Sequence, residues 1–225
     1  MDSLRRIILK TYVMSDLHND VNRFEEMLKK IQFSKQDMLY IVGDVFDRCN
    51  YDPNPVDLYF RILELEDRCS IIRGNHDQWI AQYIRRYYSL PERKRKKLEP
   101  YPYNTFQKMK ERLTPADMMV LADYIMEWPL QLQLEINGKK YLLAHAMTSD
   151  PEDIQPDEYH LTGPEDMSIF EDGIEGYISI LGHNVTDGRI LKNKSGTVYE
   201  IDCGCGFRNG NLGCICLETE EEFYV

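Results

Sequence analysis

Carboxylate, amide and imidazole side chains recur in five short polar clusters, each directly after an apolar run. The clusters read D-L-H-N-D from residue 16, G-D-V-F-D-R from residue 43, R-G-N-H-D from residue 73, A-H-A from residue 144 and G-H-N from residue 182. Hard and borderline metal ions accept oxygen and imidazole ligands of these kinds together. Five such clusters in one place could therefore build a two-metal hydrolytic centre.

The residue types suggest how the ligands would be divided between two ions. Asp16 and His18 stand two residues apart and can reach the same side of one ion, while Asp44 can bridge two ions through its two oxygens. We expect the first ion on Asp16, His18 and Asp44. The second ion is expected on Asp44, Asn75, His145 and His183.

Alternating strands and helices must position the first three clusters. Apolar runs predict strands over 7–14, 38–42 and 69–72, and a helical period predicts a helix over 21–31. Asn54 and Pro55 open a second helix, because proline is tolerated at the first helical position. Each cluster then lies at the carboxyl end of a strand, which is the edge where ligands bind in open α/β sheets.

The second half of the chain begins with a helical, aromatic and basic stretch over 78–127, which carries E-R-K-R-K-K at 92–97. We interpret this stretch as a helical cap inserted into a single domain of residues 1–225. Thr114 and Pro115 mark a helix start within it. Strands resume at 131–136 and 140–144, joined by an Asn137-Gly138 turn. An acidic loop over 150–171 follows, and then short strands over 177–181, 198–201, 213–217 and 222–225.

Composition excludes several classes of protein. The net charge of −11 argues against a broad nucleic-acid footprint. No apolar segment approaches the roughly 20 residues that span a bilayer, so we expect no membrane partner and a cytoplasmic location. Four cysteines form C-x-C…C-x-C, which is either a zinc site or, as we prefer, a set of buried free thiols: Cys203, Cys205, Cys214 and Cys216.

The order of these motifs resembles the calcineurin-like metallophosphoesterase superfamily. Its pattern is D-x-H, G-D-x-x-D-R, G-N-H-[DE], a single His after a strand, and G-H, and the match runs from Asp16 to His183. In particular, it looks like the branch containing phosphoprotein phosphatases and symmetric diadenosine-tetraphosphate hydrolases. The resemblance implies an α/β fold of two mixed β-sheets packed as a sandwich, with helices on the outer faces. It also implies in-line attack by a hydroxide bridging two ions, without a phosphoenzyme.

The resemblance assigns further roles. His76 corresponds to the proposed general acid, and Asp47 to the carboxylate that orients it; a supporting, orienting role for His76 is the alternative. Arg48 and Arg73 correspond to phosphate-binding arginines, with Asn75 beside them, although Arg48 can instead pair with a loop acid such as Asp52. His160 lies outside every motif, and we expect it at the surface.

Two departures from the family pattern bear on the substrate. No second His follows His183, where Asn184 and Val185 stand, and no Arg or Lys lies between His145 and His183. We predict a binuclear metal-dependent phosphoesterase that hydrolyses phosphomonoesters and is serine/threonine protein phosphatase-like. The alternatives are a dinucleoside polyphosphate (diadenosine tetraphosphate) hydrolase and a non-catalytic scaffold. The cofactors would be two divalent or trivalent ions, manganese first, with iron or zinc as alternatives.

Overall fold

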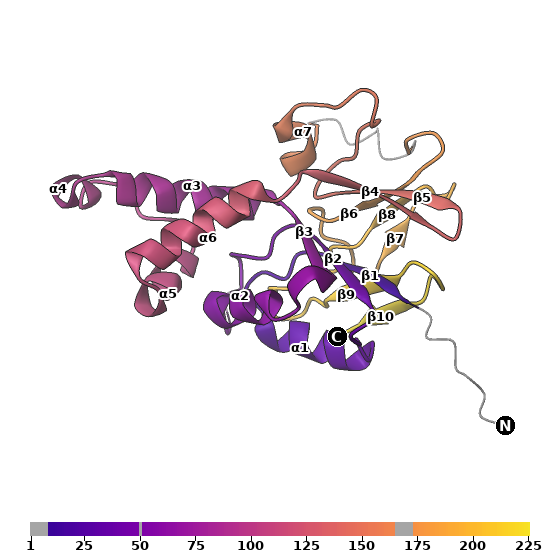
Figure 1. Ribbon diagram of the computed structural model, residues 1–225, viewed down its shortest axis with the longest axis horizontal. Coiled ribbons are helices and arrows are strands. Elements are labelled where there is room, and N and C mark those ends of the chain that lie inside the picture. The colour runs from indigo at the N-terminus through magenta and orange to yellow at the C-terminus, as the bar shows by residue number, and fades with distance from the viewer. Residues whose placement is uncertain (1–8, 50, 165–172) are drawn as a thin grey trace.

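Two five-stranded mixed sheets form the centre of the computed structural model, which describes residues 9–49, 51–164 and 173–225 (Figure 1). The first sheet has the order β10-β9-β1-β2-β3, with β1, β2 and β3 parallel and β9 antiparallel to β1. Its strands are β1 (Thr11–Met14), β2 (Met38–Val42), β3 (Cys69–Ile72), β9 (Gly213–Cys216) and β10 (Glu222–Tyr224). The part of the first predicted strand before residue 9 lies outside the described residues.

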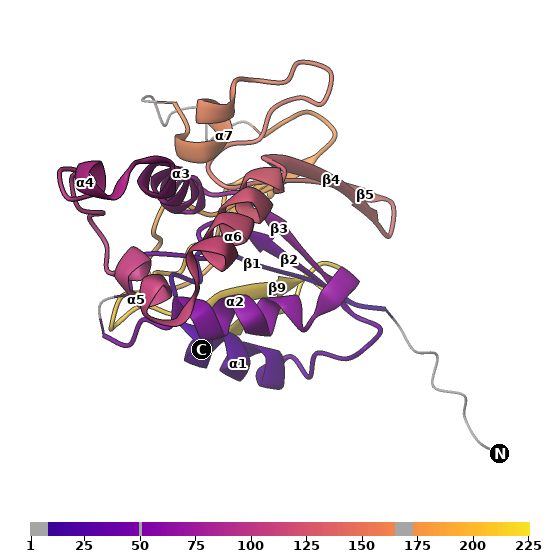
Figure 2. The same ribbon diagram turned by 60° about the vertical axis from the view of Figure 1, so that its left-hand side comes forward.

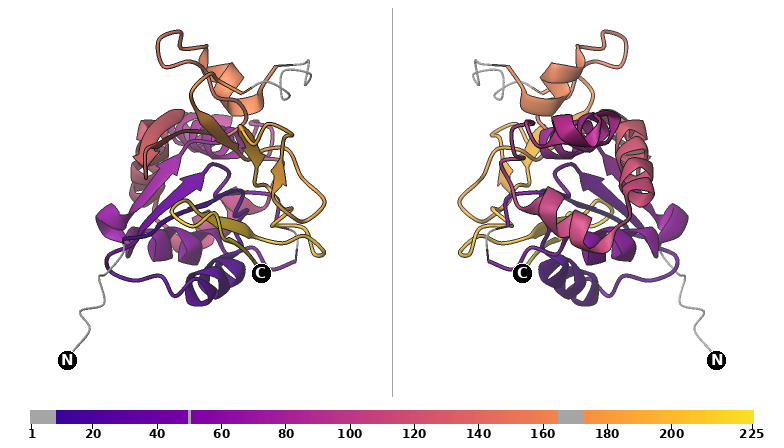
Figure 3. Two further views of the ribbon diagram at one scale, coloured as in Figure 1. Left: turned by 90° about the vertical axis from the view of Figure 1, so that its right-hand side faces the viewer. Right: turned by 90° about the vertical axis from the view of Figure 1, so that its left-hand side faces the viewer.

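The second sheet has the order β4-β5-β6-β8-β7. The Asn137-Gly138 turn joins β4 to β5 as predicted, and β5, β6 and β8 are parallel. The strands are β4 (Gln131–Ile136), β5 (Lys139–Ala144), β6 (Ile178–Leu181), β7 (Leu191–Lys192) and β8 (Val198–Glu200). The left view of Figure 3 shows the last strands of the chain, in yellow, beside the first ones, in agreement with the β9–β1 pairing.

Residue alternation along the strands of the first sheet divides the core in two. Tyr12 and Met14 of β1 point to the cluster formed with the helices, whereas Val13 between them packs toward the second sheet. The same alternation places Ile71 with the helices and Ile72 between the sheets. The sandwich predicted from the sequence is therefore confirmed.

Two helices cover the outer face of the first sheet (Figure 2). Helix α1 (Val21–Lys30) begins after Asp20, whose side chain accepts a hydrogen bond from Arg23 N. Helix α2 (Pro55–Leu63) begins after Asn54 in the same way, with proline at its first position. A short 3₁₀ turn, η1 (Glu66–Arg68), leads into β3.

Helices α3 to α6 extend to one side of the sheets, away from β4 to β8 (Figure 1). They are α3 (Asn75–Ser89), α4 (Glu92–Arg95), α5 (Thr105–Arg112) and α6 (Pro115–Glu127). Thr114 and Asp117 form the expected cap of α6, since each side chain accepts a hydrogen bond from the other's backbone N–H. That 78–127 is a cap within one domain stays an interpretation.

The expectation of a surface His160 is wrong. Part of the predicted acidic loop forms helix α7 (Asp157–Thr162), and His160 is 2% exposed within it. The His160 carbonyl accepts a hydrogen bond from Ala146 N at 2.8 Å, and its Nδ1 lies 2.8 Å from the Met147 carbonyl. These contacts fold α7 back against the end of β5 and bury the ring. Across the described parts of the chain, no helix combines the length and apolarity needed to cross a bilayer.

Candidate active site

The five polar clusters meet because the strands that carry them end at the same edge of the sandwich. They follow β1, β2 and β3 in the first sheet and β5 and β6 in the second. Backbone hydrogen bonds join neighbouring loops directly: Asp16 N donates to the Gly43 carbonyl at 3.0 Å, and His18 N to the Asp44 carbonyl at 3.1 Å. The Gly182 amide donates in turn to the His145 carbonyl at 2.8 Å and joins the two loops of the second sheet.

The backbone at this edge adopts conformations that are uncommon for residues with a side chain. Positive φ angles there cost free energy, because Cβ crowds the carbonyl oxygen. Such residues persist only where their surroundings fix them, and they cluster at functional sites. Among the described non-glycine residues, seven of the eleven with positive φ belong to the polar clusters: Asp16, His18, Asn19, Asp44, Asp47, Arg48 and His183.

The three predicted ligands of the first ion are brought together in a buried group. One donor atom from each of Asp16, His18 and Asp44 lies within 4.8 Å of the others. His18 Nδ1 lies 3.0 Å from the Phe46 carbonyl, so Nε2 is the nitrogen that faces Asp16 Oδ1 at 3.5 Å. Asp16 Oδ1, His18 Nε2 and Asp44 Oδ2 are buried without a hydrogen-bond partner.

The predicted ligands of the second ion also converge. Asn75 Oδ1 lies 3.0 Å from His145 Nε2 and 3.1 Å from His183 Nδ1. Asp44 Oδ1 lies 3.3 Å from His145 Nε2, and Asp44 also belongs to the group with Asp16 and His18, so it stands between the two sets of donors. The Val42 carbonyl, 3.0 Å from His145 Nδ1, fixes the ring.

Burial and mutual charge shift the protonation of these groups. Burial, and after it the charge of Asp202, raises the pKa of Asp16. Burial acts to raise the pKa of Asp44 as well, yet His145 beside it holds that pKa below its ordinary value. Burial acts to lower the pKa of His145, but Asp44 outweighs it and raises the pKa to about 10. A proton on His145 thus balances buried negative charge, and cations bound here would displace it.

The donor set fits metal ions on these observations. Buried polar atoms almost always have partners, and a cation would satisfy these three buried atoms, which belong to residues whose donor atoms lie within 4.8 Å of one another. Bound cations would supply Lewis-acid activation of water and of phosphoryl oxygens. The assignment of Asp16, His18, Asp44, Asn75, His145 and His183 as ligands stays a prediction.

His76 and Asp47 form the expected dyad at the start of α3. His76 Nδ1 lies 3.1 Å from Asp47 Oδ2, and Nε2 lies 4.0 Å from Asp44 Oδ2 without a hydrogen bond. Tyr101 adds a third member, because its hydroxyl donates to the same Asp47 oxygen at 2.5 Å. Burial raises the pKa of Asp47, and the bonds from His76 and Tyr101 counteract it. The dyad therefore fixes the His76 ring with Nε2 facing Asp44.

The two predicted phosphate-binding arginines differ in their surroundings. Burial is the main cause that lowers the pKa of His18 to about 3 and that of His183 to about 4, and the charge of Arg48 makes a smaller contribution in the same direction. Asp52, the alternative partner of Arg48, accepts a hydrogen bond from Asn22 instead. Arg73 is 7% exposed and donates to the Met126 carbonyl at 2.7 Å. It also pairs with Asp157 at 3.9 Å, so a role in phosphate binding would compete with both contacts.

Sequence reasoning missed three carboxylate or phenol groups of the site. Asp77 accepts hydrogen bonds from Gly74 N and Phe46 N and so ties the start of α3 to the β2 loop. Asp202 is fully buried, and its Oδ2 has no partner. It follows β8 just as the predicted ligands follow their strands, a signal that was available. Tyr101 comes from the predicted cap and carried no such signal.

The cysteines behave as buried thiols. Cys214 and Cys216 alternate with Ile215 on β9 and pack in the core against the helices, together with Cys205. Burial raises the pKa of the Cys203 thiol to about 12. Among the described residues, the cysteines do not join any group of metal-binding donors.

The sequence of this chain matches that of a known protein family. A family model described as calcineurin-like phosphoesterase matches residues 9–203, which include all six predicted ligands. Two curated proteins named "Bis(5'-nucleosyl)-tetraphosphatase, symmetrical" are similar: that of Buchnera aphidicola subsp. Acyrthosiphon pisum (strain Tuc7) is 36% identical over 70 residues, and that of Nitrosomonas europaea is 34% identical over 70 residues. Each match covers 31% of this chain, and the chain spans only about a quarter of the relatives' lengths, 24% and 25%.

Solved structures share the fold at low identity. A "putative diadenosine tetraphosphatase" superposes with a TM-score of 0.67 at 16% identity, covering 99% of this chain and 95% of that one. A serine/threonine phosphatase from Saccharomyces cerevisiae gives 0.57 at 16% identity, covering 92% of this chain and 72% of that one. At such identity, the likeness is one of fold alone.

Proposed function

The chain belongs to the calcineurin-like phosphoesterases, and we propose that within this hydrolase family it cleaves a dinucleoside polyphosphate symmetrically. The observation that carries the chemistry is the unpartnered Nε2 of His76, held by Asp47 and facing Asp44 beside the predicted metal ligands. A proton donor beside carboxylates that are predicted to bind metal ions suits attack at phosphorus with departure of an oxygen leaving group.

Each of these residues has a separate role in the proposed reaction. Water loses a proton to solvent as it forms the new bond to phosphorus, the anhydride P–O bond opposite to it breaks, and a proton from solvent restores His76 after the reaction. Arg48 offers a guanidinium to the phosphoryl oxygens. His76 donates the Nε2 proton to the departing oxygen, and Asp47 stabilises the histidine in the orientation that this requires. For diadenosine tetraphosphate, symmetric cleavage yields two molecules of adenosine diphosphate.

The choice of substrate class rests on the relatives and on charge. The curated relatives are named as symmetrical tetraphosphatases, which agrees with the alternative that the sequence left open. The serine/threonine phosphatase-like activity, our first preference from the sequence, gains no specific support from them. A bulky phosphoprotein is also disfavoured by the lack of Arg or Lys between His145 and His183.

A substrate panel tests the proposal. The purified protein, loaded with Mn²⁺ and in parallel with Zn²⁺ or Fe²⁺, is assayed on diadenosine tetraphosphate and on a set of phosphoserine and phosphothreonine peptides. We expect adenosine diphosphate as the sole nucleotide product, and a higher kcat/KM for the dinucleotide than for any peptide. Preference for the peptides, or production of adenosine monophosphate with adenosine triphosphate, would contradict it.

A further inference from the structure

A side-chain stripe on α3 leads outward from the predicted general acid. His76, Trp79, Tyr83 and Arg86 are spaced by three, four and three residues, which places them on one face of the helix. At 1.5 Å of rise per residue, the stripe extends about 15 Å from His76 to Arg86. The Trp79 ring begins it, with its centroid 4.7 Å from that of His76.

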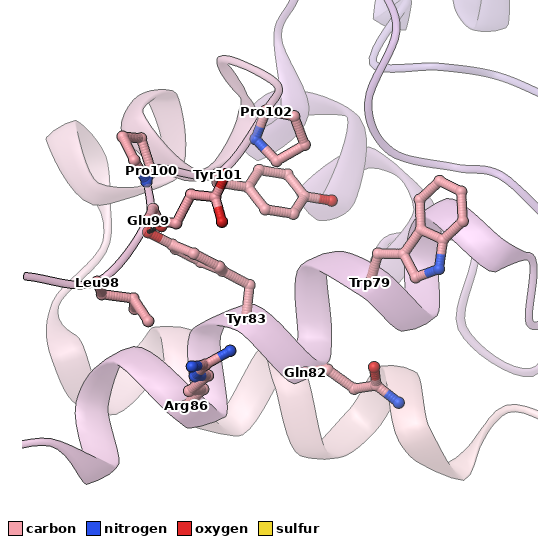
Figure 4. Close-up of a pocket in the computed structure, with 9 residues that line it drawn as sticks. All are labelled: Trp79, Gln82, Tyr83, Arg86, Leu98, Glu99, Pro100, Tyr101 and Pro102. Atoms are coloured by element: carbon pink, nitrogen blue, oxygen red, sulfur yellow. Dashed lines mark hydrogen bonds between the residues drawn. The ribbon is translucent and has the colours of Figure 1, made fainter.

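A cavity of about 500 Å³ lies over this stripe (Figure 4). Its floor is α3, and its other wall is the segment Leu98, Glu99, Pro100, Tyr101 and Pro102 between α4 and α5. Cavities of roughly 300–1,000 Å³ are typical for small ligands. The wall is fixed to the site through the hydroxyl of Tyr101 on Asp47, and to α3 through Tyr83, whose hydroxyl donates to the Glu99 carbonyl at 3.1 Å.

The lining favours a planar ring. Trp79 is 42% exposed, although tryptophan is among the residues that gain most from burial. Tyr83, Tyr101 and two prolines supply further flat apolar surface. Aromatic side chains stack on nucleobases with little regard to sequence, because every base has a π-face.

Polar groups at the rim remain available for the edge of such a ring. The side chains of Gln82 and Arg86 line the cavity and form no hydrogen bond or ion pair with another described residue. Arg85, their neighbour on the other side of α3, is by contrast held by Asp123 at 2.6 Å. Amide and guanidinium groups are the side chains that pair with base edges. Exposed Lys96 and Lys97 directly precede the wall and add positive charge in a protein whose net charge is −11.

We propose that this cavity is the subsite for the nucleobase of the leaving nucleotide. The inference rests on the proposed dinucleotide substrate and deepens it: the half of the substrate that departs from the His76 side extends along α3 and stacks its base among Trp79, Tyr83 and Tyr101. The cap would then select nucleotides over other phosphate esters. It would do so without any contact to the predicted metal ligands.

Tryptophan fluorescence tests binding without turnover. The protein has two tryptophans, and Trp128 is only 6% exposed, so a base stacked in the cavity should quench Trp79. We expect adenosine diphosphate to quench the metal-loaded protein, inorganic pyrophosphate not to, and the quenching to vanish in Trp79→Phe. Quenching that is absent, or equal for both ligands, would overturn the subsite.

Selectivity provides the second test. Loss of a stacked base corresponds to a factor of about 5 to about 150. We therefore expect Trp79→Ala to reduce the ratio of kcat/KM for diadenosine tetraphosphate to that for glycerol 2-phosphate, which has no ring, by this factor. Arg86→Ala should reduce the ratio less, and Arg85→Ala, the matched control, should leave it unchanged. A ratio unaltered in Trp79→Ala, or a preference of the cavity for a phosphotyrosine peptide, would refute the proposal.

The two proposals fail in different ways. If diadenosine tetraphosphate is not hydrolysed while glycerol 2-phosphate is, the proposed function is wrong, and the fluorescence titration with adenosine diphosphate still decides whether the cavity binds a base. If the dinucleotide is hydrolysed but Trp79 neither reports nor selects the base, the function stands and the subsite is wrong.

Discussion

Replacement of Tyr101 by phenylalanine isolates one hydrogen bond to the dyad. The change keeps the ring and removes only the hydroxyl that donates to Asp47 Oδ2 at 2.5 Å. Burial, and after it the Asp47 charge, raises the pKa of Tyr101 above its ordinary value, so the phenol stays a donor throughout the working pH range. A hydrogen bond to a charged group contributes about 1.5–3 kcal/mol.

This energy sets the expected loss of rate. If all of this energy were lost from the transition state, the rate would decrease by about 10- to 150-fold, at about 1.4 kcal/mol per factor of ten. His76 retains its own bond to Asp47, so we expect a decrease of about tenfold in kcat with little change in KM. Because the lost donor counteracts the effect of burial, the pKa of Asp47 rises further in the variant. The acidic limb of the pH–rate profile should therefore move to higher pH.

The assay compares two leaving groups. Phenyl phosphate releases a more basic oxygen than p-nitrophenyl phosphate and depends more on a proton donor. Tyr101→Phe should reduce turnover of phenyl phosphate more strongly, while Tyr88→Phe, which removes a hydroxyl bonded to Met118 sulfur, serves as the control. Equal losses on both substrates, or none, would refute the coupling of Tyr101 to the acid.

Three further outcomes follow from the structure. At a metal concentration 100 times Kd, binding contributes about 2.7 kcal/mol, so Tm should rise by about 5–11 °C; an unchanged Tm in calorimetry would contradict a folded-state metal site. Gly74→Ala should reduce both metal content and turnover, since a Cβ there would lie 2.2 Å from Asp44 Oδ1. Retention of both would show that the loop can shift to make room for the methyl group. Cys203 should resist iodoacetamide at pH 8, because its pKa is about 12. Above about pH 9 the unfolded chain loses the thiol proton that the folded chain keeps, so the stability of the protein in urea should fall between about pH 9 and about pH 12. Rapid labelling of Cys203 in the native protein would contradict its raised pKa.

The sequence predicted those parts of the site that follow from strand ends. Asp16, Asp44 and His183 each stand two residues after the end of a strand, and parallel strands deliver such residues to one edge. The order of the motifs predicted the family, and a model of that family matches residues 9–203. Most of the predicted strand bounds coincide with the observed ones or differ by one residue. Among the described residues, however, the first strand begins at Thr11, although the prediction included residues 9 and 10, and β7 was not predicted.

The remainder required tertiary structure. Tyr101 reaches Asp47 across 54 positions only because the segment after α4 folds back over α3. His160 is buried because α7 packs against the end of β5, which a loop rich in acids and prolines does not reveal. Arg73 follows its motif, yet its guanidinium contacts a carbonyl of α6 that no local pattern predicts.

Metal content measured together with turnover tests the central claim most directly. Elemental analysis of the purified protein should find about two transition-metal ions per chain, and chelation should remove both the ions and the hydrolysis of p-nitrophenyl phosphate. Asp44→Asn, which replaces one oxygen of the residue that stands between the two sets of donors, should bind less metal and lose turnover. A metal-free preparation that hydrolyses phosphate esters at the full rate, or an Asp44→Asn protein with undiminished metal, would contradict the account.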